Sequence, residues 1–129
     1  METHNVAVWL DHREAKLFRV DGPTFEQPVS VRAHHSHIKK HEVTTAEHKH
    51  PADAEHYYHA VVSQLREATA VLVMGPSSAK LELIKHVHRH DPAFASKLVG
   101  VETVDHPTDK QIAAFARHYF EKREQAATS

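Results

Sequence analysis

Fifteen histidines are the most unusual chemical feature of this 129-residue chain. Imidazole rings bind metal ions, transfer protons and titrate close to neutral pH, so each of these functions has to be considered. Six of the histidines fall in a stretch that breaks both helical and strand periodicity. These six are His34, His35, His37, His41, His48 and His50. We expect residues 34–50 to form a mobile loop rich in histidine and lysine.

Basic side chains accompany these histidines and predict contact with RNA or with the ribosome. Lysine and arginine bind phosphates, and imidazole rings stack on unpaired bases. The predicted RNA-binding residues are Arg32, His34, His35, His37, Lys39, Lys40 and Lys49. Glu42 and Glu47 dilute the positive charge, so a solvated loop without a ligand is the alternative.

Metal binding or a response to pH is a second hypothesis for the histidines. His86 and His90 have the i,i+4 spacing of many helical zinc sites, and two pairs within residues 34–50 have the spacing of one strand face. The helix shows no His-Glu-x-x-His pattern, however, and close pairs arise by chance among so many histidines. We therefore predict no dedicated metal site and no cofactor. A histidine-rich metal- or pH-responsive binding protein stays open as the alternative function.

A turn after a short apolar run offers a site for an anion. Residues 71–74 predict a strand buried on both faces, and Gly75 and Pro76 end it. Ser77 or Ser78 is expected to cap the following helix. The predicted anion-binding residues are Ser77, Ser78 and Lys80. The turn lacks the glycine and lysine spacing of a phosphate loop, which argues against nucleotide hydrolysis.

Two acid-histidine dipeptides, Asp11-His12 and Asp105-His106, are candidates for acid-base chemistry. Neighbouring residues on a strand point to opposite faces, so we expect neither dipeptide to form a catalytic pair by itself. Cross-pairing of Asp11 with His106 at the strand ends is an alternative. A small metal-dependent hydrolase or nuclease needs several clustered carboxylates, and few are available here. We assign no catalytic residue and favour a protein that is not an enzyme.

The elements that position these residues follow from hydrophobic patterning. Strands are expected at residues 6–10, 15–20, 27–33, 71–74 and 99–104, with helices starting near Ala52, Ser78 and Thr108. Asp53 is a plausible cap for the first helix, and Thr108 with Gln111 has capping-box spacing for the third. The buried stripe of the third helix is expected to be Ile112, Phe115, Ala116 and Tyr119. The order β-β-β-α-β-α-β-α predicts an α/β fold, a mixed five-stranded sheet with helices on its faces.

Length and composition limit the number of domains, the possible cysteine chemistry and the expected location of the protein. The length fits one domain over residues 1–129, with a frayed tail at 123–129. The absence of cysteine excludes disulfides and thiolate metal sites. No apolar run reaches the roughly 18 residues that span a bilayer, and the first residues do not resemble a signal peptide. We expect a cytoplasmic protein without membrane contact, and a dimer through an edge strand near Val29 stays open.

Three short segments of the sequence resemble a known protein family. Residues 6–18, Val-Ala-Val-Trp-Leu-Asp-His-Arg-Glu-Ala-Lys-Leu-Phe, resemble the opening strands of the middle domain of archaeo-eukaryotic class-1 release factors and pelota. Residues 71–80 and 99–109 resemble small stand-alone bacterial relatives called translational machinery proteins. The resemblance implies a fold similar to ribosomal proteins of the L18 and S11 type, with a ribonuclease-H-like topology.

The chain departs from this family at the residues that perform catalysis. The resemblance places a Gly-Gly-Gln tip, which hydrolyses peptidyl-tRNA, after the opening strands. This chain has only Gly22, Gly75 and Gly100, so it contains no Gly-Gly pair, and residues 34–50 take the place of the tip. We therefore predict a non-enzymatic, translation-associated protein that binds the ribosome or RNA without hydrolysing peptidyl-tRNA.

Overall fold

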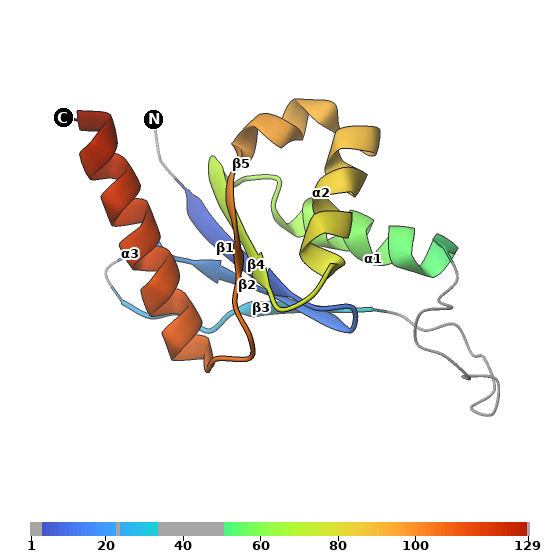
Figure 1. Ribbon diagram of the computed structural model, residues 1–129, viewed down its shortest axis with the longest axis horizontal. Coiled ribbons are helices and arrows are strands. Elements are labelled where there is room, and N and C mark those ends of the chain that lie inside the picture. Colours follow the sequence, from blue (N-terminus) through green and yellow to red (C-terminus); the bar gives the residue numbers. More distant parts are fainter. Residues whose placement is uncertain (1–3, 23, 34–50, 129) are drawn as a thin grey trace.

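The computed structural model describes residues 4–22, 24–33 and 51–128 (Figure 1). The predicted histidine-lysine loop at 34–50 lies outside these residues. Of the predicted RNA-binding residues, only Arg32 is described.

The five strands form one mixed sheet in the order β3-β2-β1-β4-β5. Their bounds are β1 Asn5–Leu10, β2 Glu14–Arg19, β3 Val29–Arg32, β4 Ala70–Gly75 and β5 Leu98–Thr103. β1 pairs antiparallel with β2, which pairs antiparallel with β3, whereas β1, β4 and β5 run parallel. The predicted mixed five-stranded α/β fold is confirmed.

The two central strands are buried on both faces. Every residue of β1 and β4 is buried, as expected for strands covered by helices on both sides. Odd and even positions divide between two cores: Val71 and Val73 pack in one, Leu72 and Met74 in the other.

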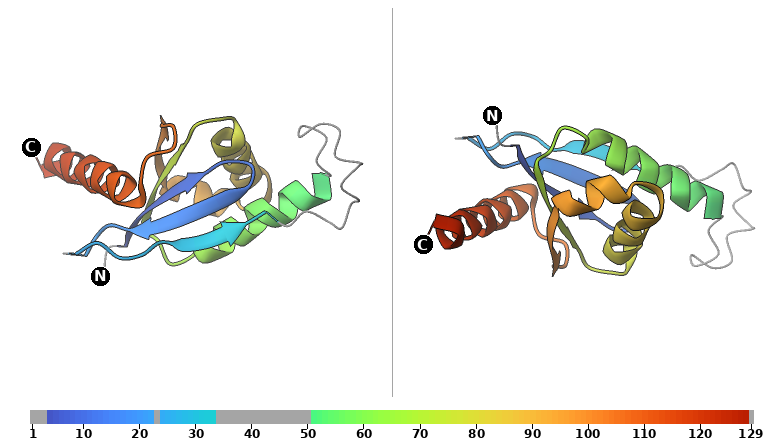
Figure 2. Two further views of the ribbon diagram at one scale, coloured as in Figure 1. Left: turned by 90° about the horizontal axis from the view of Figure 1, so that it is seen from below. Right: turned by 90° about the horizontal axis from the view of Figure 1, so that it is seen from above.

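Helices cover both faces of the sheet (Figures 1 and 2). α1 Pro51–Gln64 and α2 Ala79–His90 pack on the first core, together with the 3₁₀ helix η2 Pro92–Lys97. α3 Asp109–Thr128 covers the other face alone. Because one helix covers that face, Phe115 at its margin is 42% exposed, although we predicted it to be buried, whereas Phe120 is buried.

All three helices start within one residue of the predicted positions, but the predicted capping is confirmed only at α3. α1 begins at Pro51, so Asp53 lies in the first turn and is not the cap; proline suits a first helical position because it lacks the amide hydrogen. Ser78 occupies the cap position of α2, but its side chain makes no capping hydrogen bond. At α3 the capping box is present: Thr108 N donates to Gln111 Oε1 (2.9 Å) and Gln111 N donates to Thr108 Oγ1 (3.2 Å).

The carboxyl-terminal tail is helical rather than frayed, because α3 continues through Thr128. Residues 123–128 contain no glycine or proline and include several strong helix formers, which let the helix continue. Within the part of the chain that is described, no helix is long and apolar enough to cross a bilayer.

Gly75 is required for a close approach and not for an unusual backbone angle. No glycine of the chain has a positive φ. A Cβ at Gly75 would collide with the carbonyl oxygen of Leu10 on the neighbouring strand β1. The missing side chain therefore lets the ends of β1 and β4 lie close together, and these ends carry the residues described next.

Candidate functional site

Three loops that carry polar or ionisable side chains meet at one edge of the sheet. β1, β4 and β5 are parallel, so their carboxyl ends lie at the same edge, here called the carboxyl edge. Asp11-His12 follows β1, Ser77-Ser78 follows β4, and Asp105-His106 comes shortly after β5. The parallel pairing therefore places the loops near Gly75 and Asp105 on one side of the sheet.

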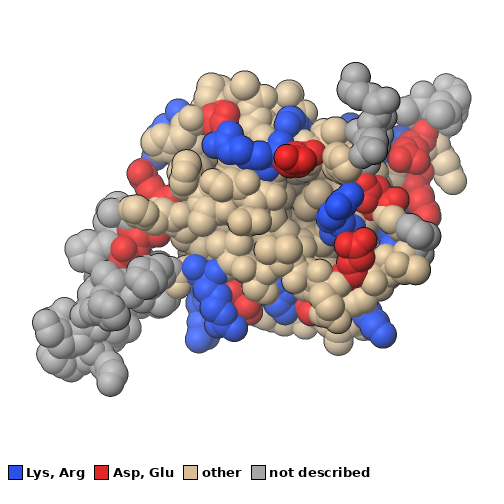
Figure 3. Space-filling view, turned by 180° about the vertical axis from the view of Figure 1, so that it is seen from behind, with Lys and Arg blue, Asp and Glu red and all other residues tan. Residues whose placement is uncertain are grey.

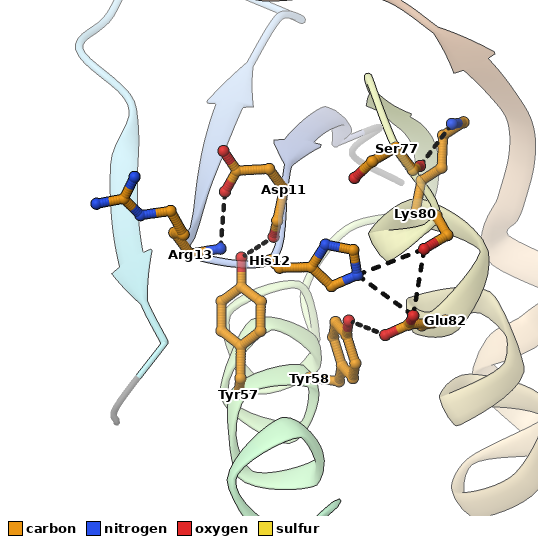
Figure 4. Close-up of polar contacts among 9 residues, drawn as sticks. Asp11, His12, Arg13, Tyr57, Tyr58, Ser77, Lys80 and Glu82 are labelled. Atoms are coloured by element: carbon orange, nitrogen blue, oxygen red, sulfur yellow. Dashed lines mark hydrogen bonds and ion pairs between the residues drawn. The ribbon is translucent and has the colours of Figure 1, made fainter. Parts of the chain in front are cut away.

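A polar cluster around Glu82 occupies the middle of this edge (Figure 4). Its members are His12, Tyr58, Ser78 and Glu82, called here the Glu82 cluster. Glu82 Oε1 accepts a hydrogen bond from the Tyr58 hydroxyl (2.7 Å). Glu82 Oε2 lies 3.3 Å from His12 Nε2 and accepts from Ser78 Oγ at 3.3 Å. Three segments of the chain thus meet at one carboxylate: the turn after β1, α1 and the start of α2.

The cluster favours an ionised Glu82. Partial burial alone would raise the pKa of this carboxyl group, but hydrogen bonds from Tyr58, His12 and Ser78 and the charge of His12 outweigh it, so the pKa is lowered. Burial, followed by the hydrogen bond to Glu82, raises the pKa of Tyr58, so its phenol keeps the proton that it donates. Burial and the nearby charge of Asp11 also raise the pKa of Tyr57, whose hydroxyl donates to the Asp11 carbonyl at 2.8 Å.

The Glu82 cluster does not have the geometry of a serine-histidine-carboxylate triad. In a triad one ring nitrogen faces the nucleophile and the other faces the carboxylate. Here Ser78 Oγ and Glu82 Oε2 both lie near Nε2 of His12, at 3.4 and 3.3 Å. Glu82 Oε2 accepts from Ser78 Oγ, so the serine hydroxyl donates to the carboxylate and is not set up as an activated nucleophile. Sequence patterning did not single out Glu82; its position four residues after Ser78 is the one local signal that could have indicated it.

The predicted anion site overlaps this cluster. Lys80 is only 7% exposed, and its Nζ donates to the Ser77 carbonyl (2.7 Å). Ser77 Oγ is buried without a hydrogen-bond partner among the described residues. The Glu82 carboxylate already lies in the first turn of α2, where negative charge is favoured. Anion binding by Ser77, Ser78 and Lys80 remains a prediction, and an anion there would have to compete with Glu82.

The end of the carboxyl edge at β3 is basic. β3 runs in the same direction as β1, so Arg32 at its end belongs to this edge, as does Arg13 in the turn after β1. Both arginines are exposed, and Ala33 N donates to the Arg13 carbonyl at 2.8 Å. Residues 34–50 therefore continue the chain from this basic end. On the face seen in Figure 3, Lys and Arg lie in separate groups around a broad uncharged area, so that face carries no continuous basic strip.

The dipeptide Asp105-His106 forms a pair, contrary to our expectation. His106 Nδ1 lies 2.8 Å from Asp105 Oδ1, and Nε2 lies 3.8 Å from Asp11 Oδ2. The premise of alternating side chains fails because both residues lie in the loop after β5. The alternative that we considered, cross-pairing of Asp11 with His106, is present. Trp9 Nε1 donates to the Asp105 carbonyl (2.9 Å) and fixes the position of this loop.

His86 and His90 form an aromatic packing contact. Their rings lie 4.7 Å apart, and the ring of His86 also lies 6.1 Å from that of Tyr58. Burial, followed by the charge of His90, lowers the pKa of His86 and keeps this side chain neutral. No group of three or more metal-binding side chains occurs among the described residues.

Comparison with known proteins gives a match in structure and none in sequence. No protein-family model and no curated sequence matches the chain. Pelota from Thermoplasma acidophilum matches 85% of this chain with a TM-score of 0.57 and 16% identity. The archaeal translation termination factor aRF1 matches 96% with a TM-score of 0.55 and 13% identity. Dom34 of S. cerevisiae, a translation termination-like factor involved in RNA quality control pathways and interacting with Hbs1, matches 78% with a TM-score of 0.54 and 11% identity.

These matches define the class of fold. The chain covers 30% of Pelota, 39% of aRF1 and 29% of Dom34, about a third of the length of each. Identities this low establish the fold alone. The chain has a release-factor-like middle-domain fold, as the resemblance of its short sequence segments implied.

Proposed function

We propose that this protein is a non-enzymatic, translation-associated domain that binds the ribosome or RNA through the basic end of its carboxyl edge. The observation that carries this proposal is the fold shared with Pelota and aRF1, in a chain without a Gly-Gly pair. The arrangement of the Glu82 cluster also argues against hydrolysis, because Ser78 and Glu82 share one ring nitrogen of His12 instead of facing its two nitrogens as in a triad. Partners belong to the translation machinery, and catalysis plays no part.

Arg32 anchors the proposed contact surface. Arg32 is exposed, and the residue after it, Ala33, donates its backbone N–H to the Arg13 carbonyl, just before the chain continues into the segment with Lys39, Lys40 and Lys49. Clustered cations release counterions from phosphates, so the affinity falls steeply as salt is raised. The three histidines His34, His35 and His37 add charge when the pH falls, which strengthens the contact.

Co-sedimentation with ribosomes tests this function. We expect the protein to pellet with ribosomes at about 50 mM salt and to be released at about 200 mM. The triple variant Arg32→Ser, Lys39→Ser, Lys40→Ser should weaken binding by about tenfold or more. The matched control removes three exposed cations from α2 and α3, Lys85→Ser, Lys122→Ser and Arg123→Ser, and should bind like the wild type.

Co-sedimentation with ribosomes also distinguishes the proposed function from the alternative, a metal- or pH-responsive binding protein. Binding to ribosomes should be stronger at pH 6 than at pH 7.5 and should not require zinc. Absence of binding at low salt, or equal losses in the two triple variants, would contradict the proposal. Stoichiometric zinc uptake without ribosome binding would instead favour a metal-responsive protein.

A further inference from the structure

A cleft of about 650 Å³ lies where the chain passes from β5 into α3. Its floor contains the buried side chains of Met74 and Ile112, and Val104 and Pro107 form part of its walls. None of its lining residues belongs to the Glu82 cluster. The volume falls within the range of clefts that bind ligands or peptide side chains.

Phe115 gives this cleft an exposed apolar wall. The neighbouring positions Ile112 and Ala116 are buried against the sheet, whereas Phe115 remains 42% exposed at the margin of α3. Among the described residues it is the only large exposed hydrophobic residue that lines this cleft. An apolar partner would remove this aromatic surface from water, which is the main source of affinity in small interfaces.

One carboxylate, that of Asp105, lines the cleft, and the carboxylate of Asp11 lies just outside its lining. Asp105 is 93% exposed, and Asp11 faces it across the ring of His106. Among the described residues, no lysine or arginine lies within ion-pair distance of Asp11 or Asp105, whereas the nearby Asp109 is paired with Lys16 (3.0 Å). Two carboxylates thus share one imidazole, so this margin of the cleft carries more acidic than basic side chains.

We infer that this cleft is a docking site for a protein partner, specifically for a peptide segment in which an apolar side chain lies next to arginine or lysine. The apolar side chain would contact Phe115 above Met74 and Ile112, and the cation would pair with Asp105 and Asp11. Charge complementarity selects this occupant, because the same carboxylates repel the phosphates of RNA. The strand order places this acidic cleft at the β5 end of the carboxyl edge and the proposed RNA contact at the β3 end.

Titration of the isotope-labelled full chain with four short peptides tests the inference. Their termini are acetylated and amidated, and their cores are Arg-Leu-Arg, Arg-Ala-Arg, Glu-Leu-Glu and Ser-Leu-Ser. We expect saturable NMR shifts at Asp105, Gln111 and Phe115 with Arg-Leu-Arg. The other three peptides should bind at least about fivefold more weakly, because each lacks the apolar anchor or the cations.

Variants of the protein locate the contact. Phe115→Ala should weaken binding of the Arg-Leu-Arg peptide by about fivefold, and Asp105→Asn by about two- to fivefold. Leu81→Ala is the matched control, since Leu81 is 49% exposed on α2 and does not line the cleft. All three sites are exposed, so the fold should persist, and unchanged NMR spectra away from the substitution would verify this.

Three results would overturn the inference: no shifts with Arg-Leu-Arg, equal binding of all four peptides, or equal losses in Phe115→Ala and Leu81→Ala. A single-stranded RNA oligonucleotide that shifts the cleft residues more strongly than the peptide would overturn it as well. Failure of ribosome binding would not affect this result, because the two experiments use different residues and different ligands.

Discussion

Glu82 shows how one side chain can connect segments that are distant in the sequence. Its carboxylate contacts His12 after β1, Tyr58 on α1 and Ser78 at the start of α2. Sequence patterning predicted the strand before His12 and the starts of the two helices that carry Tyr58 and Glu82. It did not predict their contact, because the contact depends on the pairing of β1 with β4, which no local signal encodes.

The bond between Tyr58 and Glu82 should contribute measurably to stability. In a double-mutant cycle with Tyr58→Phe and Glu82→Gln, we expect a coupling of about 1 kcal/mol in urea unfolding, since a phenol donates to a carboxylate. The matched cycle uses Tyr57→Phe, because Tyr57 donates to the Asp11 carbonyl instead. Coupling of Glu82 to Tyr57 as large as that to Tyr58 would refute this assignment.

For helices and strands, signals within a few residues of the sequence predicted the structure reliably. Contacts between residues distant in the sequence were not predicted. The capping box at Thr108 is complete within four residues, and the prediction was confirmed. At α2, Ser78 occupies the cap position, but distant His12 and the nearby Glu82 engage its hydroxyl. Likewise, Phe115 and Phe120 both lie near the apolar stripe of α3, and only the width of the sheet beneath decides which is buried.

Removing the capping box should destabilise α3. Thr108→Ala eliminates the acceptor for Gln111 N and should lower the free energy of unfolding by about 1 kcal/mol. Thr108→Ser keeps the hydroxyl and serves as the control, with a much smaller effect. Chemical denaturation followed by circular dichroism measures both; equal losses in the two variants would show that the hydroxyl contributes little.

At the scale of the whole molecule, the sequence predicted the element order and the mixed sheet, but not the strand order. Patterning identifies which strands are buried on both faces, and a helical crossover implies parallel neighbours. It does not state that β1 lies between β2 and β4. The acidic and basic ends of the carboxyl edge, which carry the two proposals, depend on that order.

Folding stability should fall as the medium becomes mildly acidic. Burial lowers the pKa of His86 below its unfolded value near 6.5, so the unfolded chain binds the proton first. The stability that His86 provides is therefore complete above about pH 6.5 and is lost as the pH falls toward its folded pKa. Glu82 adds a second loss, below its ordinary pKa of 4.5.

Urea unfolding at pH 7.5 and pH 5.5 measures this dependence. We expect the wild type to be less stable at pH 5.5, and His86→Phe to show a smaller difference between the two pH values. His88→Phe, at an exposed position on the same helix, controls for the loss of a histidine from the unfolded chain. An unchanged difference in His86→Phe would contradict the assignment.

The central position of β1 has a consequence for how the nascent chain folds. β1 meets β2 across a short hairpin, but its other neighbour, β4, begins at Ala70, opposite Asn5. During synthesis the three-stranded meander emerges with one side of β1 unpaired, and that side stays open until β4 leaves the ribosome. Pairing β4 with β1 closes the long loop between them, which costs chain entropy and slows folding. The docking of β4 onto β1 is therefore the step at which incompletely synthesised chains are most prone to incorrect strand pairing.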